Sequence, residues 1–132
     1  MKKIVGAILF LMIAILASGC DPNPSGSGQN EFSPPEWIWG TWVNGDTIVT
    51  FTSDNIIYAT PTMIQNFSED FGNPAVSRIT ETISTTFYQV TVADTESPSF
   101  GTYRFVYDTE DTINFTLTIP EVTLGPWELV RH

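Results

Sequence analysis

Apolar and polar residues alternate along most of the second half of the chain, and the alternation is clearest over residues 112–120. There Ile113 and Phe115 fall on one face of the run, and polar residues fall between them. A period of two is the pattern of a strand with one buried side. Residues 101–108 show the same pattern, and a short polar turn joins them to residues 112–120. The two runs therefore predict an antiparallel hairpin.

Six further runs have the same character, with threonine, isoleucine, valine and aromatic residues inside them and Gly, Pro, Asp or Asn between them. They cover residues 37–43, 47–52, 55–60, 77–84, 85–94 and 125–131. Antiparallel strands in sequential order close most naturally into a barrel, because closure removes exposed edges. The expected fold class is therefore all-β, a small antiparallel up-and-down β-barrel of about eight strands. A β-sandwich is the alternative.

Residues 62–71 are the stretch in which a helical spacing competes with the strand pattern. Met63, Ile64, Phe67 and Phe71 recur at that spacing, and a glycine and an Asn-Pro pair follow as stop signals. We expect one short helix or compact loop that crosses an end of the sheet. Its apolar face either fills the core or forms a lid over a pocket.

The start of the chain has the pattern of an export signal. Lys2 and Lys3 precede an uninterrupted apolar run over residues 4–17, and small residues then lead to Cys20. The run is shorter than the roughly 20 residues that a helix needs to cross a bilayer. This arrangement resembles the bacterial lipobox, in which the cysteine is lipidated and becomes the new N-terminus. The resemblance implies a signal peptide over residues 1–19 and a lipid anchor on Cys20 in a membrane of the bacterial cell envelope.

Loss of this signal changes the charge of the protein. Both lysines lie in it and all 15 acidic residues lie outside it, so the mature chain has three arginines and a net charge of −12. Such a body is repelled by a phosphate backbone, which excludes nucleic-acid binding. An anionic bilayer surface also repels it, so the lipid is left as the means of membrane attachment.

The composition changes again after the cysteine. Residues 20–35 hold the lipidation site and a stretch rich in Pro, Gly, Ser and Asn. Such a stretch buries too little surface to offset its ordering entropy, so we expect a flexible linker. Residues 36–132 then form one domain of about 100 residues, the usual size for a single core.

Three short segments resemble the first, second and last strands of lipocalin-like domains: WGTW at 39–42, FTSD at 51–54 and WELVR at 127–131. In that family a first-strand Trp closes the base of the barrel, and a late Arg packs on it. The resemblance implies these structural roles for Trp42 and Arg131, with Gly40 completing the Gly-x-Trp motif. A guanidinium over an indole contributes about 0.5–2 kcal/mol.

No set of residues predicts catalysis. His132 is the single histidine and the last residue, and a hydroxyl nucleophile needs a positioned base. The acidic run at residues 108–111 offers oxygens to calcium but lacks the glycine and the spacing of an EF-hand loop. We therefore expect a protein that is not an enzyme and that has no cofactor and no metal site.

Two functions remain open. The first is binding of a small apolar ligand, because the domain has more aromatic residues than a core of its size needs. That ligand would enter near residues 62–71 and contact Met63, Phe67, Phe71, Tyr103, Phe105 and Phe115. The second is a surface or periplasmic scaffold, with a filled barrel and acidic loops that meet an unidentified protein partner. An interior void below about 300 Å³ favours the scaffold, because ligand pockets are usually larger.

Overall fold

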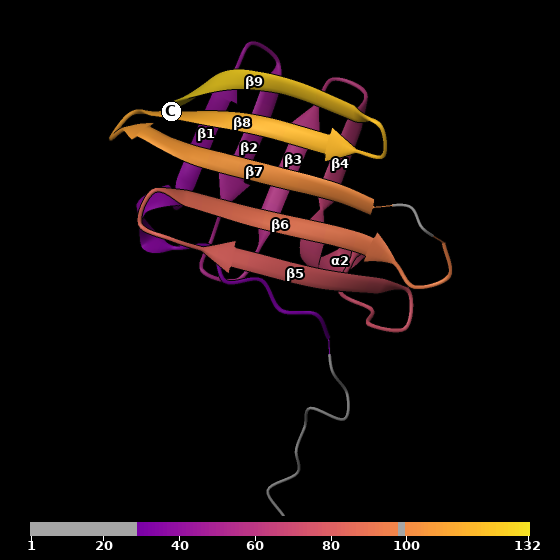
Figure 1. Cartoon of the computed structure of the whole chain (residues 1–132). Coiled ribbons are helices and arrows are strands. Elements are labelled where there is room, and N and C mark those ends of the chain that lie inside the picture. The colour runs from indigo at the N-terminus through magenta and orange to yellow at the C-terminus, as the bar shows by residue number, and fades with distance from the viewer. Residues whose placement is uncertain (1–28, 98–99) are drawn as a thin grey trace, which may run out of the picture.

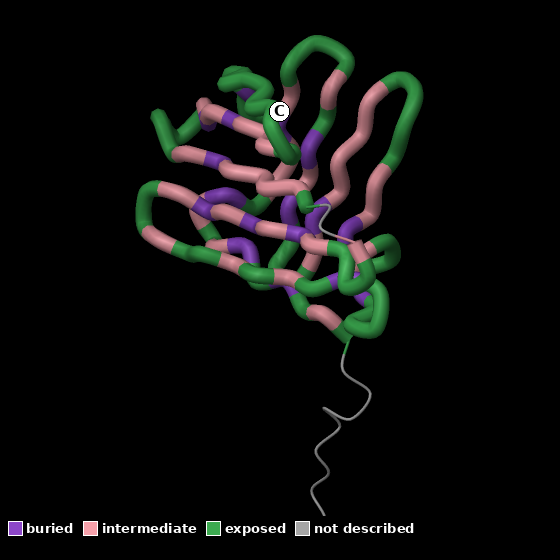
Figure 2. Tube along the Cα trace, turned by 45° about the vertical axis from the view of Figure 1, so that its right-hand side comes forward, coloured by how far each residue is buried: buried purple, intermediate pink, exposed green. Residues whose placement is uncertain are grey.

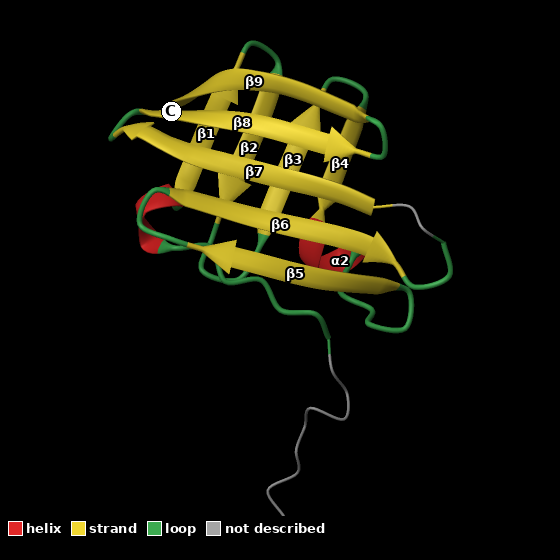
Figure 3. Ribbon diagram, viewed as in Figure 1, coloured by secondary structure: helices red, strands yellow, loops and turns green. Residues whose placement is uncertain are grey.

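Nine antiparallel strands form one sheet in the computed structural model, which describes residues 29–97 and 100–132. The strands are β1 (Gly40–Asn44), β2 (Thr47–Phe51), β3 (Ile56–Thr60), β4 (Met63–Asn66), β5 (Ser77–Ile83), β6 (Phe87–Asp94), β7 (Phe100–Thr109), β8 (Thr112–Ile119) and β9 (Val122–Arg131). A 3-10 helix, η2 (Glu36–Ile38), precedes β1, and a one-turn helix, α2 (Phe67–Asp70), follows β4 (Figure 3).

The strand order makes the sheet a curled half-barrel. The order is β4-β3-β2-β1-β9-β8-β7-β6-β5, so the last strand pairs with the first, and β4 and β5 form the two edges. The half made of β1–β4 lies behind the half made of β5–β9, and the strands of the two halves cross (Figure 1). The expected antiparallel up-and-down topology is confirmed, and the barrel is half-closed. One continuous sheet replaces the two separate sheets of the sandwich alternative.

Both expected hairpins are present, as β2–β3 and β7–β8. The additional strand is β4, which pairs with β3 through four residue pairs that begin with Thr60 opposite Met63. A helix over all of residues 62–71 is therefore wrong, because only residues 67–70 are helical. Four residues are too few for apolar spacing to separate a strand from a helix, and pairing with β3 decides the structure.

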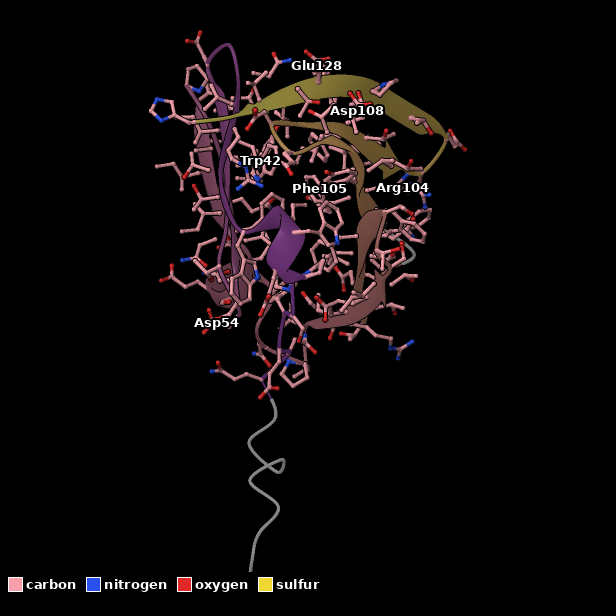
Figure 4. The ribbon with its side chains drawn as sticks, turned by 90° about the vertical axis from the view of Figure 1, so that its left-hand side faces the viewer. Trp42, Asp54, Arg104, Phe105, Asp108 and Glu128 are labelled. Carbon is pink, nitrogen blue, oxygen red and sulfur yellow. The ribbon has the colours of Figure 1, made fainter. Side chains whose placement is uncertain are left out.

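The core lies between the two halves of the sheet and follows the alternation of the strands. In β6, for example, Tyr88, Val90 and Val92 are buried and the residues between them are less so. Buried positions of both halves face each other (Figure 2). From the side, Trp42 and Phe105 lie between the halves, whereas Arg104 and Glu128 lie at the periphery (Figure 4). The interior is thus filled largely by apolar side chains.

Residues 29–35, which the sequence places in the linker, pack on the domain. Phe32 is buried, and its ring lies 5.7 Å from that of Phe67 in an edge-to-face arrangement. The side-chain amide of Asn30 donates hydrogen bonds to the carbonyls of Phe71 and Ser77, each at 2.8 Å. This segment therefore joins the end of α2 to the start of β5, on the side where the sheet is open. One aromatic residue in a polar stretch was too weak a signal to reveal this packing.

Trp42 and Arg131 meet where β1 pairs with β9. Trp42 is fully buried, and its indole nitrogen donates a hydrogen bond to the carbonyl of Ile38 at 2.7 Å. The guanidinium carbon of Arg131 lies 4.2 Å from the centre of the indole ring. This is the contact that the lipocalin-like resemblance implies, and it sits at the corner where the two halves of the sheet join.

The same guanidinium holds three backbone carbonyls. It donates hydrogen bonds to the carbonyl oxygens of Trp37, Trp39 and Glu110 at 3.2, 2.8 and 2.9 Å. Gly40 lies beneath it with φ of +116°, and a Cβ there would approach Arg131 Nη1 to 3.2 Å. Glycine at this position thus allows both the backbone conformation and the approach of the guanidinium.

Tyr88 makes the folded domain less stable at alkaline pH. Burial raises the pKa of its hydroxyl, and the hydrogen bond that it donates to Glu81 raises that pKa further. The unfolded chain therefore loses this proton first, so stability should fall as the pH rises above about 10. We expect lower urea midpoints at about pH 11 than at about pH 9, and a smaller difference in Tyr88→Phe. An equal pH dependence in Tyr88→Phe and wild type would contradict this assignment.

Candidate functional site

A pocket of about 310 Å³ opens at one end of the half-barrel. The strands β5–β8 are antiparallel, so the start of one strand lies beside the end of the next. All four strands contribute residues to this pocket. The end of α2 completes the wall. We call this the end pocket, and it is lined by Phe71, Val76, Ser77, Val92, Asp94, Phe100, Gly101, Tyr103 and Ile119.

Two of the six residues expected to contact a ligand, Phe71 and Tyr103, line the end pocket. Phe67 lies behind them, fully buried, with its ring 5.2 Å from Phe71 and 4.8 Å from Tyr103. Both contacts are edge-to-face, the arrangement that aromatic pairs favour. The structure therefore makes Phe67 a support for the pocket wall rather than part of its surface.

The structure does not bring the other expected residues to this pocket. Met63 is 47% exposed beside the turn between β3 and β4, where it pairs with Thr60. Phe105 is buried in the core, 4.8 Å from Phe51 of the opposite half. Phe115 lines a different hollow, beside β9.

A hydrogen bond crosses the interior of the half-barrel beside the end pocket. The hydroxyl of Tyr103 on β7 donates to Oε1 of Gln65 on β4 at 3.1 Å. Burial raises the pKa of Tyr103, and the nearby Tyr58 raises it further, so the phenol keeps its proton at neutral pH. The bond joins one edge strand to the opposite half of the sheet and holds Tyr103 in place.

The lining of the end pocket favours neutral ligands. Six of its nine residues are apolar or aromatic, counting Phe71, Val76, Val92, Phe100, Tyr103 and Ile119. Asp94 supplies a carboxylate at the end of β6, and no arginine is among the lining residues. A bound carboxylate or phosphate would therefore meet a like charge without a compensating cation.

A second hollow, of about 190 Å³, lies beside β9. We call it the β9 pocket, and it is lined by Asn44, Thr47, Tyr58, Phe115, Trp127 and Leu129. Its volume is below the roughly 300 Å³ at which ligand pockets usually begin. Buried core side chains from both halves of the sheet pack between them.

Some of these lining residues had a signal in the sequence. Ile119 continues the apolar face of residues 112–120, and Tyr58 and Trp127 belong to the aromatic surplus of the domain. Val76 lies in the turn before β5 and Phe100 is the first residue of β7, so neither lies within a periodic pattern. Their place in the pocket depends on how the strand ends come together, which the local sequence does not specify.

Neither a metal-binding cluster nor a membrane-spanning helix is present in residues 29–97 and 100–132. No three or more His, Cys, Asp or Glu side chains there come together in a way that could hold a metal ion. No helix in these same ranges combines the length and the apolar character needed to cross a membrane.

No protein-family model, curated protein or solved structure gives a significant match to this chain.

Proposed function

We propose that this chain is a lipid-anchored protein of the bacterial cell envelope that binds a small, neutral, apolar ligand in the end pocket. The observation that carries the proposal is the end pocket itself, about 310 Å³ and lined mainly by apolar and aromatic side chains. That volume is within the usual range for ligand pockets, which are mostly apolar with a few polar groups. The protein acts by binding and is not an enzyme.

The anchoring part of the proposal rests on the sequence alone. Cys20 and the apolar run before it lie outside the described residues. The net charge of −12 after signal removal supports a lipid as the means of attachment, because an anionic surface repels the domain. The described part of the chain begins beside α2 and β5, because Asn30 donates hydrogen bonds to the carbonyls of Phe71 and Ser77.

Decanol is a suitable probe for the ligand site because it is apolar and uncharged. Gly101 lines the end pocket, and a Cβ there would lie 3.5 Å from the ring of Tyr103. Gly101→Leu should therefore fill the pocket and abolish decanol binding. Ile119→Ser should weaken binding about five- to tenfold through loss of apolar contact. Equilibrium dialysis of the full chain in detergent micelles, against micelles without protein, measures both effects.

Ile48→Ser is the matched control for Ile119→Ser. Ile48 on β2 is 42% exposed and Ile119 is 39% exposed, but Ile48 does not line the end pocket. We expect the control to bind decanol as wild type does. Absence of saturable binding in wild type, or equal binding by Gly101→Leu, would refute a ligand site here.

The filled interior favours a second candidate function, a scaffold that presents acidic loops to a protein partner. Among the described residues, fourteen apolar side chains form the buried core, and the β9 pocket within the half-barrel is about 190 Å³. A rigid scaffold needs no larger void. This candidate replaces the first if the wild-type chain shows no saturable decanol binding.

A further inference from the structure

We infer that the β9 pocket is a separate binding site for a neutral molecule with one aromatic ring and one hydroxyl group, a simple phenol. It shares no lining residue with the end pocket, so this inference goes beyond the proposed function. Four features of the pocket carry it: an aromatic ladder that ends there, its volume, its free polar groups and the absence of charged lining residues.

A ladder of aromatic residues runs across four neighbouring strands of the inner face and ends at the β9 pocket. The strand register places Tyr88 opposite Phe105, Phe105 opposite Phe115, and Phe115 opposite Trp127. Consecutive ring centres are 6.4, 4.8 and 5.5 Å apart. The first three residues are buried, whereas Trp127 is 38% exposed. The ladder therefore ends in an aromatic ring that is open to a ligand.

The position of β9 explains why this ring is open. β9 pairs with β1 only at its C-terminal end, where Arg131 lies opposite Trp42 and Val130 opposite Val43. At Trp127 the described sheet has no strand beyond β9 on this side. Tyr58 comes from the opposite half of the sheet, and its ring centre lies 5.9 Å from that of Phe115. The pocket is thus walled by aromatic rings from both halves.

The volume fits a single ring. An enclosed apolar cavity of about 150 Å³ is known to hold one benzene molecule. The β9 pocket, at about 190 Å³, is slightly larger and leaves room for one small substituent. A fatty acyl chain needs more space than this.

Free polar groups in the wall select a hydroxyl substituent. In the described part of the chain, the Tyr58 hydroxyl has no hydrogen-bond partner. Asn44 donates through Nδ2 to the carbonyl of Glu128 at 2.7 Å, which leaves its Oδ1 as a free acceptor. A ligand hydroxyl can accept a hydrogen bond from Tyr58 and donate one to Asn44. Burial raises the pKa of Tyr58, so its hydroxyl remains a donor at neutral pH.

The wall also excludes charged ligands. None of the six lining residues is Asp, Glu, Lys or Arg. A charged molecule would lose its hydration in this pocket without gaining a partner of opposite charge. Aromatic walls add a preference for a flat ring, because aromatic pairs contribute beyond their buried area.

Para-cresol, toluene and cyclohexanol test these features separately. Para-cresol has both the ring and the hydroxyl, toluene lacks the hydroxyl, and cyclohexanol lacks the aromatic ring. Each missing feature should weaken binding about three- to tenfold relative to para-cresol. Binding is measured by equilibrium dialysis of the full chain in detergent micelles, with micelles alone as the reference.

Three variants localise the binding. Tyr58→Phe should weaken para-cresol binding about three- to tenfold and leave toluene binding unchanged, because only a hydrogen bond is lost. Trp127→Ala should abolish saturable binding of para-cresol. Trp39→Ala is its matched control, because Trp39 is also 38% exposed but does not line the pocket. Circular dichroism verifies that each variant is folded. If Trp127→Ala is unfolded, the effect of Tyr58→Phe on para-cresol and toluene binding decides the test.

The inference is overturned if para-cresol does not bind saturably to the wild-type chain. It is also overturned if Tyr58→Phe weakens toluene and para-cresol equally, or leaves both unchanged. Gly101→Leu, which fills the end pocket, should leave para-cresol binding unchanged. That result distinguishes this inference from the proposed function, because the β9 pocket can bind para-cresol whether or not the end pocket binds decanol.

Discussion

Replacing Trp42 with alanine should lower the free energy of unfolding by about 3–5 kcal/mol, the usual cost of truncating a large buried aromatic residue. Trp42 is fully buried at the corner where β1 pairs with β9. The variant removes the ring beneath the Arg131 guanidinium and the hydrogen bond to the Ile38 carbonyl. A small domain has a total stability of about 5–15 kcal/mol, so the loss is a large share of it. Urea denaturation of wild type and variant measures the difference.

Trp39→Ala is the control for this effect. Trp39 is adjacent in the chain to Gly40 but partly exposed, and it donates one hydrogen bond to the carbonyl of Pro34 at 2.7 Å. Its loss should cost about 1 kcal/mol. Equal midpoints for Trp42→Ala and wild type would contradict the closure of the half-barrel at this corner.

Replacing Cys20 with serine should abolish membrane attachment completely. A serine hydroxyl cannot take the thioether-linked lipid that the lipobox resemblance implies, and the acidic domain has no electrostatic attraction to an anionic bilayer. We expect no palmitate incorporation and no anchored mature form in this variant. Radiolabelled palmitate and membrane fractionation of the host cells measure the two effects.

Ser18→Ala is the matched control, because it changes a nearby small residue and keeps the cysteine. It should incorporate palmitate as wild type does. Palmitate incorporation that is unchanged in Cys20→Ser would refute the lipid anchor.

The local pattern of the chain predicts most of the strands because alternation records which face is buried. β8 is the clearest example, since Ile113 and Phe115 are buried and their neighbours are less so. The same logic fails at residues 63–66, where Met63 and Ile64 are both exposed and the strand exists through its pairing with β3. A pairing between strands is a property of the folded chain that no short window contains.

The local sequence pattern also does not predict that the barrel is only half-closed. Closure would require β4 to pair with β5, and instead α2 and residues 29–35 lie on that side of the domain. The buried Phe32 that holds this segment stands alone in a polar stretch. A hydrophobic pattern needs several apolar residues to indicate packing, so residues 29–35 carry no such signal in the sequence.

Prediction of the candidate site was partial for the same reason. Phe71 and Tyr103 could be chosen because they are aromatic residues on a short amphipathic segment and an alternating strand. Phe105 and Phe115 have an identical pattern but belong to the core and to the β9 pocket. Alternation gives the face of the sheet on which a residue lies but not whether core or pocket lies above it.

Native mass spectrometry of the protein purified from its own host tests the central claim most directly. We expect a mature chain that begins at Cys20 and carries the mass of its lipid, together with a bound small molecule that dissociates on collisional activation. Gly101→Leu, with its end pocket filled, should lack that bound molecule and keep the lipid. An unmodified chain without any bound molecule, or the same set of bound molecules in Gly101→Leu as in wild type, would contradict a lipid-anchored protein with a ligand in its end pocket.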